Sequence, residues 1–341
     1  MTRPFVSVVI PARNEERTIV ACLDAVLSQD WPSDRMEIIV ADGMSDDSTR
    51  RIVDERSCRD ARVRLIDNPG RIVPGGMNLA IGAARGEFIV RVDGHTIIAN
   101  DYVRVTIETL QRTGAEGAGG RMTPIVSPGF AGAVAFATSS PFGVGNSLFH
   151  YAQEETESDS VYLGAYPKTT FERFGGYDEA MVRNQDDELN YRIRARGGRI
   201  VLNPAIRSAY QPRGSVGRLF SQYFQYGWWK SRVMARIPAS ASPRHFIPSL
   251  FVLSLAGLLA TSLFIPAAAL LVAAILLLHA GASLAGAIFW SVPVDSDLNA
   301  QDWLRTVILV PVAALVLHTG YGLGLIAGLP SLVRTNTGER R

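Results

Sequence analysis

The sequence predicts an α/β domain with a mostly parallel central sheet, followed by a C-terminal helical region that enters a membrane. Two observations support this prediction. Short β-branched runs alternate with helical patterns through the N-terminal part of the chain. After about residue 246, charged side chains nearly disappear. The chain therefore divides into a soluble part that can bind a ligand and an apolar part that cannot remain in water.

Short apolar runs bounded by turn residues mark the strands of the soluble part. Amphipathic patterns between these runs mark helices, the first of which carries Ile19, Leu23 and Val26 on one face. Strand–helix alternation at this spacing favours right-handed βαβ units and hence parallel strands. The expected strands are 5–10, 37–41, 63–66 and 88–92, and the next two helices are expected at 49–56 and 75–84.

Two apolar stretches dominate the C-terminal part. Residues 246–290 contain a single ionisable side chain, His279, and residues 307–329 form the second stretch. About 20 apolar residues cross a hydrocarbon core, so the first stretch suffices for two spans, with Pro266 at the turn, and the second for one. A buried pair of soluble helices is the alternative, which the length of the runs disfavours. The expected segments are a soluble domain (1–214), an amphipathic interfacial region (215–245), about three transmembrane helices (246–333) and a polar tail (334–341).

The charges around these stretches leave the topology open. Basic residues crowd the entry to the first stretch, which places the N-terminal domain on the cytosolic side of the inner (plasma) membrane. They are Lys230, Arg232, Arg236 and Arg244. Three spans would put the basic tail outside, against the same rule, so one stretch can instead be re-entrant or interfacial. Aromatic residues among the basic ones at 216–236 favour a helix lying on anionic headgroups, although a core helix with a charged face fits too.

Bulk composition excludes some classes of function. A formal net charge of +2 gives no electrostatic argument for binding nucleic acid. The two cysteines, Cys22 and Cys58, lack metal-ligand spacing and suggest reduced thiols. No signal peptide is visible at the N-terminus.

Acidic side chains follow three of the expected strands. Glu15, Asp42 and Asp93 each stand in a loop after a strand, so they are expected to converge on the carboxyl edge of one sheet, where α/β sheets bind ligands. His95 follows Asp93 by two positions, and such a pair can hold a divalent ion that neutralises a pyrophosphate. The alternative is an ordinary turn, since Asp, Gly and His all favour turns.

The loops exclude the common phosphate-binding motifs. A dinucleotide fold would carry Gly-x-Gly-x-x-Gly after the first strand, where this chain has Pro-Ala-Arg-Asn-Glu, and no P-loop is present. Acids after the first two strands can accept hydrogen bonds from a nucleobase N–H and from ribose hydroxyls, while the metal neutralises the phosphate charge. The sequence therefore predicts a site for a nucleotide diphosphate that carries a leaving group.

Six segments in this order resemble family-2 glycosyltransferases, the inverting nucleotide-sugar enzymes of the GT-A fold, and in particular bacterial exopolysaccharide glycosyltransferases of the succinoglycan type. The resemblance runs from Val6 to about Lys230. The segments are 8–15 (VVIPARNE), 42–49 (DGMSDDST), 76–80 (GMNLA), 93–95 (DGH), 174–179 (FGGYDE) and 185–189 (QDDEL).

The resemblance implies roles for individual residues. Asp186 stands at the position of the catalytic base, and Asp93 and His95 stand at the metal motif. It implies nucleotide binding by Pro11, Asn14, Glu15, Asp42, Asn78 and Asp93, and an acceptor or donor-sugar side with Gly164, Asp187 and Arg213. The family usually has Asp-x-Asp, so His95 is a departure. Imidazole suits Mn²⁺ better than Mg²⁺, and His95 can instead donate to the phosphate, so the divalent cation is expected to be Mn²⁺ or Mg²⁺.

Asp186 is expected in the first turn of a helix that starts near Asn184 and ends near Arg196. Asn184 can cap this helix, and the helix dipole favours the ionised carboxylate that a base needs. The simplest alternative for Asp186, Asp187 and Glu188 is the ordinary enrichment of acids at helix N-termini.

The expected function is inverting transfer of a sugar from a nucleotide-diphosphate sugar, a UDP-sugar in particular, to a polyprenyl-linked saccharide at the bilayer. The Gln-x-x-Arg-Trp signature of processive synthases is missing from 222–229, which argues against a polymerising synthase. A polyprenyl-phosphate sugar synthase is the alternative enzyme, and a nucleotide-binding membrane assembly subunit without catalysis is the alternative from another class.

Overall fold

The computed structural model describes residues 3–290 and 298–330. The expected polar tail lies outside the described residues. The chain forms two compact units: residues 1–123 with 152–210, and residues 124–151 with 211–341. Two segments of the soluble domain expected at 1–214, residues 124–151 and 211–214, belong with the C-terminal helices.

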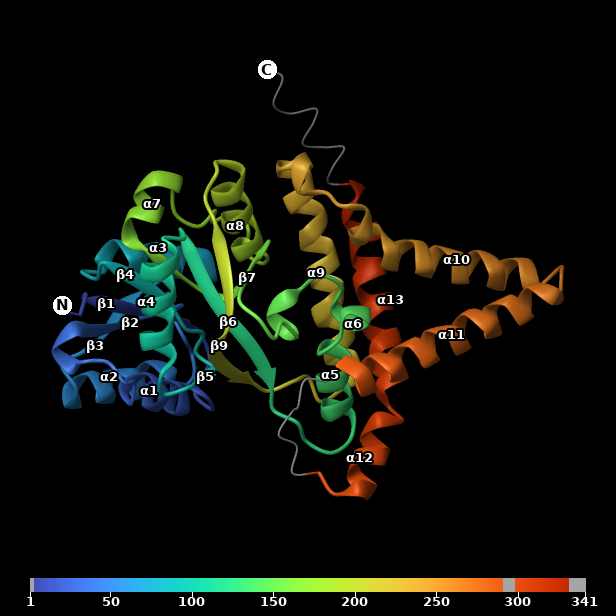
Figure 1. Cartoon of the computed structure of the whole chain (residues 1–341), viewed down its shortest axis with the longest axis horizontal. Helices are drawn as coiled ribbons and strands as arrows, with labels where there is room; N and C mark the ends of the chain where they lie inside the picture. The colour runs from blue at the N-terminus through green and yellow to red at the C-terminus, as the bar shows by residue number, and fades with distance from the viewer. Residues whose placement is uncertain (1–2, 291–297, 331–341) are drawn as a thin grey trace, which may run out of the picture. The chain divides into compact units, whose positions relative to one another are not determined.

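Unit 1 is built on a twisted sheet to which the described residues contribute nine strands (Figure 1). The strands are β1 (Val6–Ala12), β2 (Met36–Asp42), β3 (Val63–Asp67), β4 (Phe88–Arg91), β5 (Ile97–Ile98), β6 (Gly117–Pro124), β7 (Thr156–Glu157), β8 (Tyr162–Pro167) and β9 (Ile200–Tyr210). Their order is β3-β2-β1-β4-β8-β6-β9-β5, and β7 pairs with β9.

Parallel pairing is concentrated in β3, β2, β1 and β4, the strands that the sequence predicts. The strands β4 and β8, β6 and β8, and β5 and β9 pair antiparallel. Residues of β1 and β2 are buried on both faces, as parallel strands covered by helices require. The predicted α/β fold is confirmed, and the parallel half of the sheet carries the acid-bearing loops.

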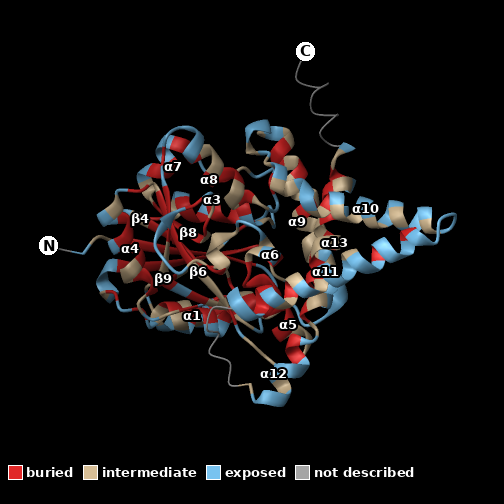
Figure 2. Cartoon of the chain, turned by 45° about the vertical axis from the view of Figure 1, so that its right-hand side comes forward, coloured by how far each residue is buried: buried red, intermediate tan, exposed pale blue. Residues whose placement is uncertain are grey.

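Helices of unit 1 connect these strands and cover the sheet. Pro74 occupies the first turn of α3, where the missing N–H costs no hydrogen bond. The helices are α1 (Ile19–Leu27), α2 (Thr49–Arg59), α3 (Val73–Ala83), α4 (Tyr102–Thr113), α7 (Lys168–Phe174) and α8 (Gln185–Ala195). The core between helices and sheet consists largely of buried branched aliphatic residues such as Val8, Ile38 and Ile107. In Figure 2 the strands of this sheet are largely coloured as buried.

Unit 2 is helical. Its helices are α5 (Phe130–Thr138), α6 (Pro141–Val144), α9 (Val216–Arg236), α10 (Ile247–Ser262), α11 (Ala267–Trp290), α12 (Ala300–Val307) and α13 (Val310–Gly328). Among the described residues, three helical segments are long and apolar enough to cross a membrane: Pro243–Ser262, Ala267–Trp290 and Ala300–Gly328. The turn between the first two contains Pro266, as the sequence predicts. A small core of α5, α13 and neighbouring residues, including Ala133, Phe136 and Val310, joins the segment 124–151 to this unit.

Candidate active site

The register of the parallel strands brings the acid-bearing loops to one edge of the sheet. Ala12 at the end of β1 pairs with Asp42 at the end of β2, and Val9 pairs with Arg91 at the end of β4. The loops after β1 and β2 are also joined directly, since the Gly43 amide donates to the Ala12 carbonyl at 2.7 Å. The predicted convergence of Glu15, Asp42 and Asp93 at the carboxyl edge of the sheet is therefore found in the structure.

Asp42 is fully buried at this edge and holds the loop that follows it. Its carboxylate accepts hydrogen bonds from the Ser45 amide at 3.1 Å and from Ser45 Oγ at 2.5 Å, and it lies 3.5 Å from Arg50 Nη1. A buried carboxylate needs such partners to remain ionised. Asp42 therefore shapes the 43–48 loop.

Asn14 joins the β1 loop to the β2 loop. Its backbone has φ of +56°, in the left-handed region that Asn tolerates better than most residues. Its amide donates to Ser45 Oγ at 3.0 Å, and its Oδ1 accepts from the Asp46 amide at 3.1 Å. Asn14 therefore fixes the shape of this edge, while Pro11 lies within β1 opposite Ala41.

Glu15 orients the ring of His95. His95 Nδ1 lies 2.9 Å from Glu15 Oε1, and Thr18 Oγ1 donates to the other carboxylate oxygen at 2.9 Å. A carboxylate oxygen accepts hydrogen bonds, so Nδ1 is the ring nitrogen that donates to Glu15. The His95 side chain is 52 % exposed. This carboxylate–imidazole pair is the arrangement that prepares a histidine nitrogen to bind a metal.

Arg91 connects the two carboxylates to which the sequence assigns chemistry. Its side chain is 6 % exposed; Nε donates to Asp93 Oδ1 at 2.8 Å and Nη2 lies 3.3 Å from Asp93 Oδ2. Nη1 of the same guanidinium donates to Asp186 Oδ1. Asp186 on α8 therefore lies at the same edge of the sheet as Asp93, although the two residues are far apart in sequence.

Burial and these charges set the ionisation of the cluster. Burial raises the pKa of Asp186 to about 6, and the positive charge of Arg91 only partly offsets this effect. Burial would also raise the pKa of Asp93, but Arg91 and His95 outweigh it and hold that pKa below its usual value. The predicted helix-dipole effect on Asp186 is thus outweighed by desolvation, and Asp186 takes up a proton more readily than Asp93.

The local structure around Asp186 confirms the predicted start of helix α8 but not its predicted cap. The helix begins at Gln185 as expected, but Asn184 has φ of +58° and its side chain makes no capping hydrogen bond. The predicted cap was wrong because the left-handed backbone turns the Asn184 side chain away from the first amides of the helix. Asp187 follows in the same first turn, and its charge contributes to the raised pKa of Asp186.

Asn78 fastens the 174–179 segment to α3. Its Oδ1 accepts from the Tyr177 amide at 2.8 Å, and its Nδ2 donates to the Tyr177 carbonyl and to Glu179 Oε1, both at 2.9 Å. Tyr177 itself is 4 % exposed, and its Oη has no hydrogen-bond partner among the described residues. Burial, followed by the charge of Asp186, raises the pKa of this phenol. An unsatisfied hydroxyl beside the Asp186 carboxylate can bind a polar group of a substrate.

Two further predicted site residues have identifiable local roles. Gly164 is buried, and a Cβ there would overlap Tyr166 Oη, which donates to Asn190 Oδ1 at 2.9 Å. Gly164 therefore makes room for Tyr166. Arg213 belongs to unit 2, is exposed, and donates from Nε to Gln222 Oε1 at 3.2 Å. The structure thus unites Asp93, His95, Glu15 and Asp186, and assigns Arg213 to the other unit.

Sequence reasoning gave no role to Arg91 or Tyr177. A signal for Arg91 was present, because a charge inside a buried apolar strand is costly unless it is paired. The partner could not be identified, since Asp186 lies on a distant helix. For the hydroxyl of Tyr177, nothing in the sequence indicates burial without a partner.

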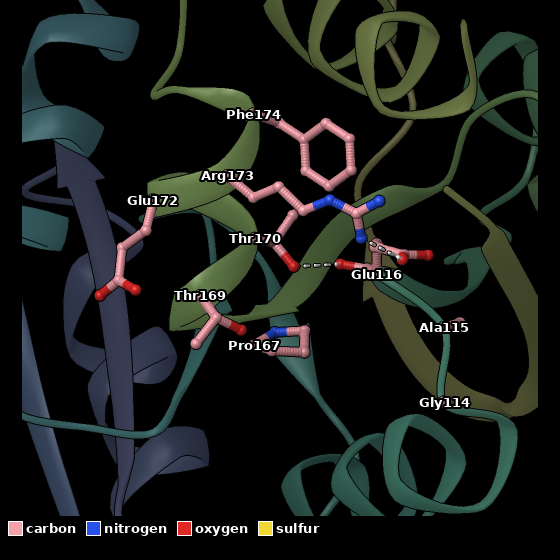
Figure 3. A pocket seen from close by; sticks show the side chains of 9 residues that line it. All are labelled: Gly114, Ala115, Glu116, Pro167, Thr169, Thr170, Glu172, Arg173 and Phe174. Atoms are coloured by element: carbon pink, nitrogen blue, oxygen red, sulfur yellow. Dashed lines mark hydrogen bonds and ion pairs between the residues drawn. The ribbon is translucent and has the colours of Figure 1, made fainter. Parts of the chain in front are cut away.

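A cavity of about 460 Å³ in unit 1 does not coincide with this cluster (Figure 3). Its wall includes Pro167, which pairs with Phe88 at the start of β4, the end opposite to Asp93. Polar groups in the wall are already paired: Thr170 Oγ1 donates to the Glu116 carbonyl at 2.9 Å, and Arg173 Nη1 lies 3.2 Å from Glu116 Oε1. The carboxyl edge, with its acids and unsatisfied Tyr177 hydroxyl, is the better candidate for chemistry.

Comparison with solved structures gives the class of protein. The chain resembles a mannosyltransferase from Pyrobaculum calidifontis solved with GDP-Man and Mn²⁺, with a TM-score of 0.56 and 21 % identity, covering 100 % of this chain and 89 % of that one. It also resembles S. aureus TarS 1-349 solved with UDP, with a TM-score of 0.51 and 16 % identity, covering 67 % of this chain and 65 % of that one. The fold is the GT-A fold of glycosyltransferases.

Comparison of sequences gives the family. Residues 7–135 match the family model described as glycosyl transferase family 2. The chain is 30 % identical over 243 residues to succinoglycan biosynthesis protein ExoA of Rhizobium meliloti (strain 1021), covering 71 % of this chain and 73 % of that protein. The chain belongs to glycosyltransferase family 2 and is a glycosyltransferase.

A second relative has a lipid-linked substrate in its name. The chain is 31 % identical over 231 residues to a dolichyl N-acetyl-alpha-D-glucosaminyl phosphate 3-beta-D-2,3-diacetamido-2,3-dideoxy-beta-D-glucuronosyltransferase of Methanococcus voltae. The match covers 65 % of this chain and 72 % of that protein.

Proposed function

We propose that the protein is an inverting glycosyltransferase that moves a sugar from a nucleotide-diphosphate sugar, a UDP-sugar, to a hydroxyl of a lipid-linked saccharide. The observation that carries this proposal is the Arg91 guanidinium, which places the Asp186 carboxylate beside Asp93 at the carboxyl edge of the sheet. A base and a group that can help bind the leaving diphosphate then face the same space, as single-displacement transfer requires.

The nucleotide would bind over the loops that follow β1 and β2. Asn14, Glu15 and Asp42 stand there, next to Pro11. Ser45 accepts from the Asn14 amide and donates to Asp42, and the Asp46 amide donates to Asn14, so the shape of this edge is fixed before a ligand arrives. Asn78 is engaged with the Tyr177–Glu179 segment, so we assign it a positioning role beside the nucleotide. In this assignment the loops of Asn14, Glu15 and Asp42 would contact the nucleotide, whereas Asn78 would hold the Tyr177–Glu179 segment beside it.

Asp93 and His95 fit a divalent cation. Glu15 Oε1 holds His95 through Nδ1, and the pKa of Asp93 lies below its usual value, so the pair offers one imidazole nitrogen and one carboxylate. Among residues 3–290 and 298–330, no group of three or more His, Cys, Asp or Glu side chains could hold a metal ion. A cation at Asp93 and His95 would therefore need further ligands, which a diphosphate and water can supply. Mn²⁺ matches the mixed nitrogen and oxygen donors better than Mg²⁺. When bound, the cation would supply positive charge for the departing diphosphate.

The Asp186 carboxylate would act as the base. The oxygen of the acceptor hydroxyl attacks the anomeric carbon and forms the new glycosidic bond, while its proton passes to Asp186. The bond between the anomeric carbon and the diphosphate oxygen breaks, and its electron pair leaves with the nucleoside diphosphate. In-line attack inverts the anomeric centre. Arg91 favours the ionised base, and the Tyr177 hydroxyl would donate to an oxygen of a bound sugar.

The lipid-linked acceptor is supported by the membrane helices and by the two relatives. Succinoglycan biosynthesis and a dolichyl-linked substrate appear in their names. The basic residues before the apolar segments favour a cytosolic catalytic unit at the inner membrane. Asp187 and Arg213 remain predictions for the acceptor and donor-sugar side.

The test uses membranes that contain the full chain. They would be incubated with radiolabelled UDP- and GDP-sugars and Mn²⁺ or Mg²⁺, and the lipid-linked product would be extracted. The proposal expects one UDP-sugar to label a lipid-linked oligosaccharide. Labelling by GDP-sugars alone would overturn the choice of nucleotide, and failure with every donor would overturn the whole proposal.

A polyprenyl-phosphate sugar synthase is the second candidate, favoured by the same membrane helices. Its acceptor is an ionised lipid phosphate, which needs no base. Supplying polyprenyl phosphate alone distinguishes the two, because only a synthase of this kind would form lipid-linked monosaccharide from it.

A further inference from the structure

The helices α10 and α11 form an apolar hairpin whose tip is exposed in unit 2. The tip comprises Leu263, Phe264, Ile265 and Pro266, and Leu263 and Phe264 are 81 % and 85 % exposed. Figure 2 shows both helices largely pale blue toward the tip, and Figure 1 shows them meeting there and separating toward α13. Such a surface needs a nonaqueous partner.

Several features make hydrocarbon the partner of this tip. Every side chain from Leu263 to Leu278 is apolar. Most backbone N–H groups at the turn are paired within the hairpin: Leu263 donates to Ala260, and Phe264 and Ile265 donate to Thr261. Ala268 and Ala269 donate to Ile265 and Pro266 in turn, and Pro266 has no N–H. Internal pairing of backbone groups is the condition for entering lipid, and a polar loop on the far side of a membrane would not need it.

Both helices are long enough to cross the bilayer, but the part of α11 that runs from the tip without a polar side chain is shorter than the hydrocarbon core. The 16 residues of α10 extend about 24 Å, and the 12 residues of α11 from Ala267 to Leu278 about 18 Å. The hydrocarbon core measures roughly 30 Å. The next residue of α11 is His279, which hydrogen-bonds His318 at 2.9 Å, and His318 Nε2 lies 2.9 Å from the Phe142 carbonyl. The first polar side chain of α11 therefore lies about 18 Å from the tip, and it is buried against His318 within unit 2.

The helix α13 differs, because it is covered by the basic helix α9. Glycines of α13 pack closely against α9, and later glycines meet later residues of α9. A Cβ at Gly320 would lie 3.0 Å from the Phe220 carbonyl oxygen, and a Cβ at Gly324 would overlap the Phe224 carbonyl oxygen. Farther along, a Cβ at Gly328 would overlap Ser231. If α13 crossed the membrane, α9 would cross beside it with its basic residues Arg218, Lys230, Arg232 and Arg236. Charges at that depth are costly.

We propose that α10 and α11 enter the bilayer as a re-entrant hairpin whose tip ends within the hydrocarbon, while α13 stays at the membrane surface paired with α9. Both ends of the hairpin then lie on the same side as α9. Basic residues and the stacked Arg232–Trp228 pair, with the guanidinium carbon 3.7 Å from the ring centroid, provide the interfacial anchor at that side. This arrangement removes the conflict between three spans and the positive-inside rule.

The test is cysteine labelling of the full chain in bacterial cells. In a Cys58→Ser background, with Cys22 buried, single cysteines would replace Phe264 at the tip, Ala239 before the hairpin, and Ile308 and Pro330 around α13. A membrane-impermeant maleimide would be added first to intact cells and then to lysed membranes. A cysteine in an external loop of a host membrane protein confirms that the reagent reaches the outer face. We expect positions 239, 308 and 330 to label from one and the same side, and position 264 from neither.

Each alternative topology gives a different result. Labelling of position 264 from the side opposite to position 239 would show two full crossings, and labelling of 308 and 330 from opposite sides would show that α13 spans. A nitroxide on the cysteine at 264 in phospholipid vesicles separates lipid contact from burial in protein. Depth within the hydrocarbon supports the proposal, whereas a value typical of headgroups or of a protein interior overturns it.

Discussion

Arg91 on β4 donates a hydrogen bond from Nη1 to Asp186 on α8. Through Nε the same guanidinium holds Asp93 at 2.8 Å, so one buried cation joins the carboxylate proposed to bind a metal to the carboxylate proposed as the base. Without it, two carboxylates would share a site in which desolvation already favours protonation of Asp186. The cluster therefore depends on a residue that sets the position and the ionisation of both carboxylates without itself being the proposed base or metal ligand.

The first prediction concerns pH. Because burial raises the pKa of Asp186 to about 6, the base is ionised above that pH and protonated below it. We expect kcat/KM for transfer to fall about tenfold per unit as pH drops below 6. Measurement of kcat/KM from pH 5 to 8, with nucleotide binding followed at the same pH values, tests this. A profile that stays flat down to pH 5 would contradict it.

The second prediction concerns Arg91. In Arg91→Met the carboxylates lose their shared positive charge, so the pKa of Asp186 rises by a further 1–3 units or so. We expect the pKa that limits kcat/KM at acidic pH to move to about 7–9, and activity at pH 7 to fall roughly 2- to 100-fold. Arg91→Lys retains the positive charge and should shift the pKa that limits kcat/KM at acidic pH by less. A merely structural role would lower the melting temperature of both variants and leave that pKa at about 6.

The third prediction concerns Asn78. Asn78→Ala removes three hydrogen bonds to the Tyr177–Glu179 segment, and we expect a loss of about 1–3 kcal/mol in the free energy of unfolding. Hydrogen exchange at Tyr177 should become faster and kcat should fall, while the Kd for UDP stays within about twofold of the wild type. A large rise in that Kd would instead assign Asn78 to direct nucleotide contact.

The fourth prediction concerns Gly164. Gly164→Ala forces its methyl group against Tyr166, and such overpacking costs about 1–3 kcal/mol. Tyr166→Phe removes the hydroxyl that the new Cβ would overlap, so the cost of Gly164→Ala should be smaller in that background. Thermal unfolding of the four proteins in detergent measures the difference. Equal costs in both backgrounds would show that the ring carbons of Tyr166, 2.7 and 2.8 Å from the new Cβ, cause the destabilisation and not the hydroxyl.

How far the sequence predicts this protein depends on the range of the interactions. Local patterns predict the parallel strands and the acids at their ends, because alternation and turn residues act over a few positions. The Arg91–Asp186 bond and the pairing of α9 with α13 escape prediction, because each joins segments remote in sequence. The Asn184 cap failed for a local reason, since its composition suits a cap but its backbone is left-handed. Grouping of 124–151 with the C-terminal helices depends on packing that no local pattern reveals.

The role of Asp186 as the base is the central claim, and Asp186→Asn tests it most directly. This variant keeps the shape of the side chain and removes the proton acceptor. We expect kcat for transfer to the lipid-linked saccharide to fall about 10²- to 10⁴-fold while the Kd for UDP is unchanged. Glu172→Gln, an exposed change on α7 away from the cluster, is the control and should leave kcat unaltered. Near-normal transfer by Asp186→Asn at pH 7 would contradict the account.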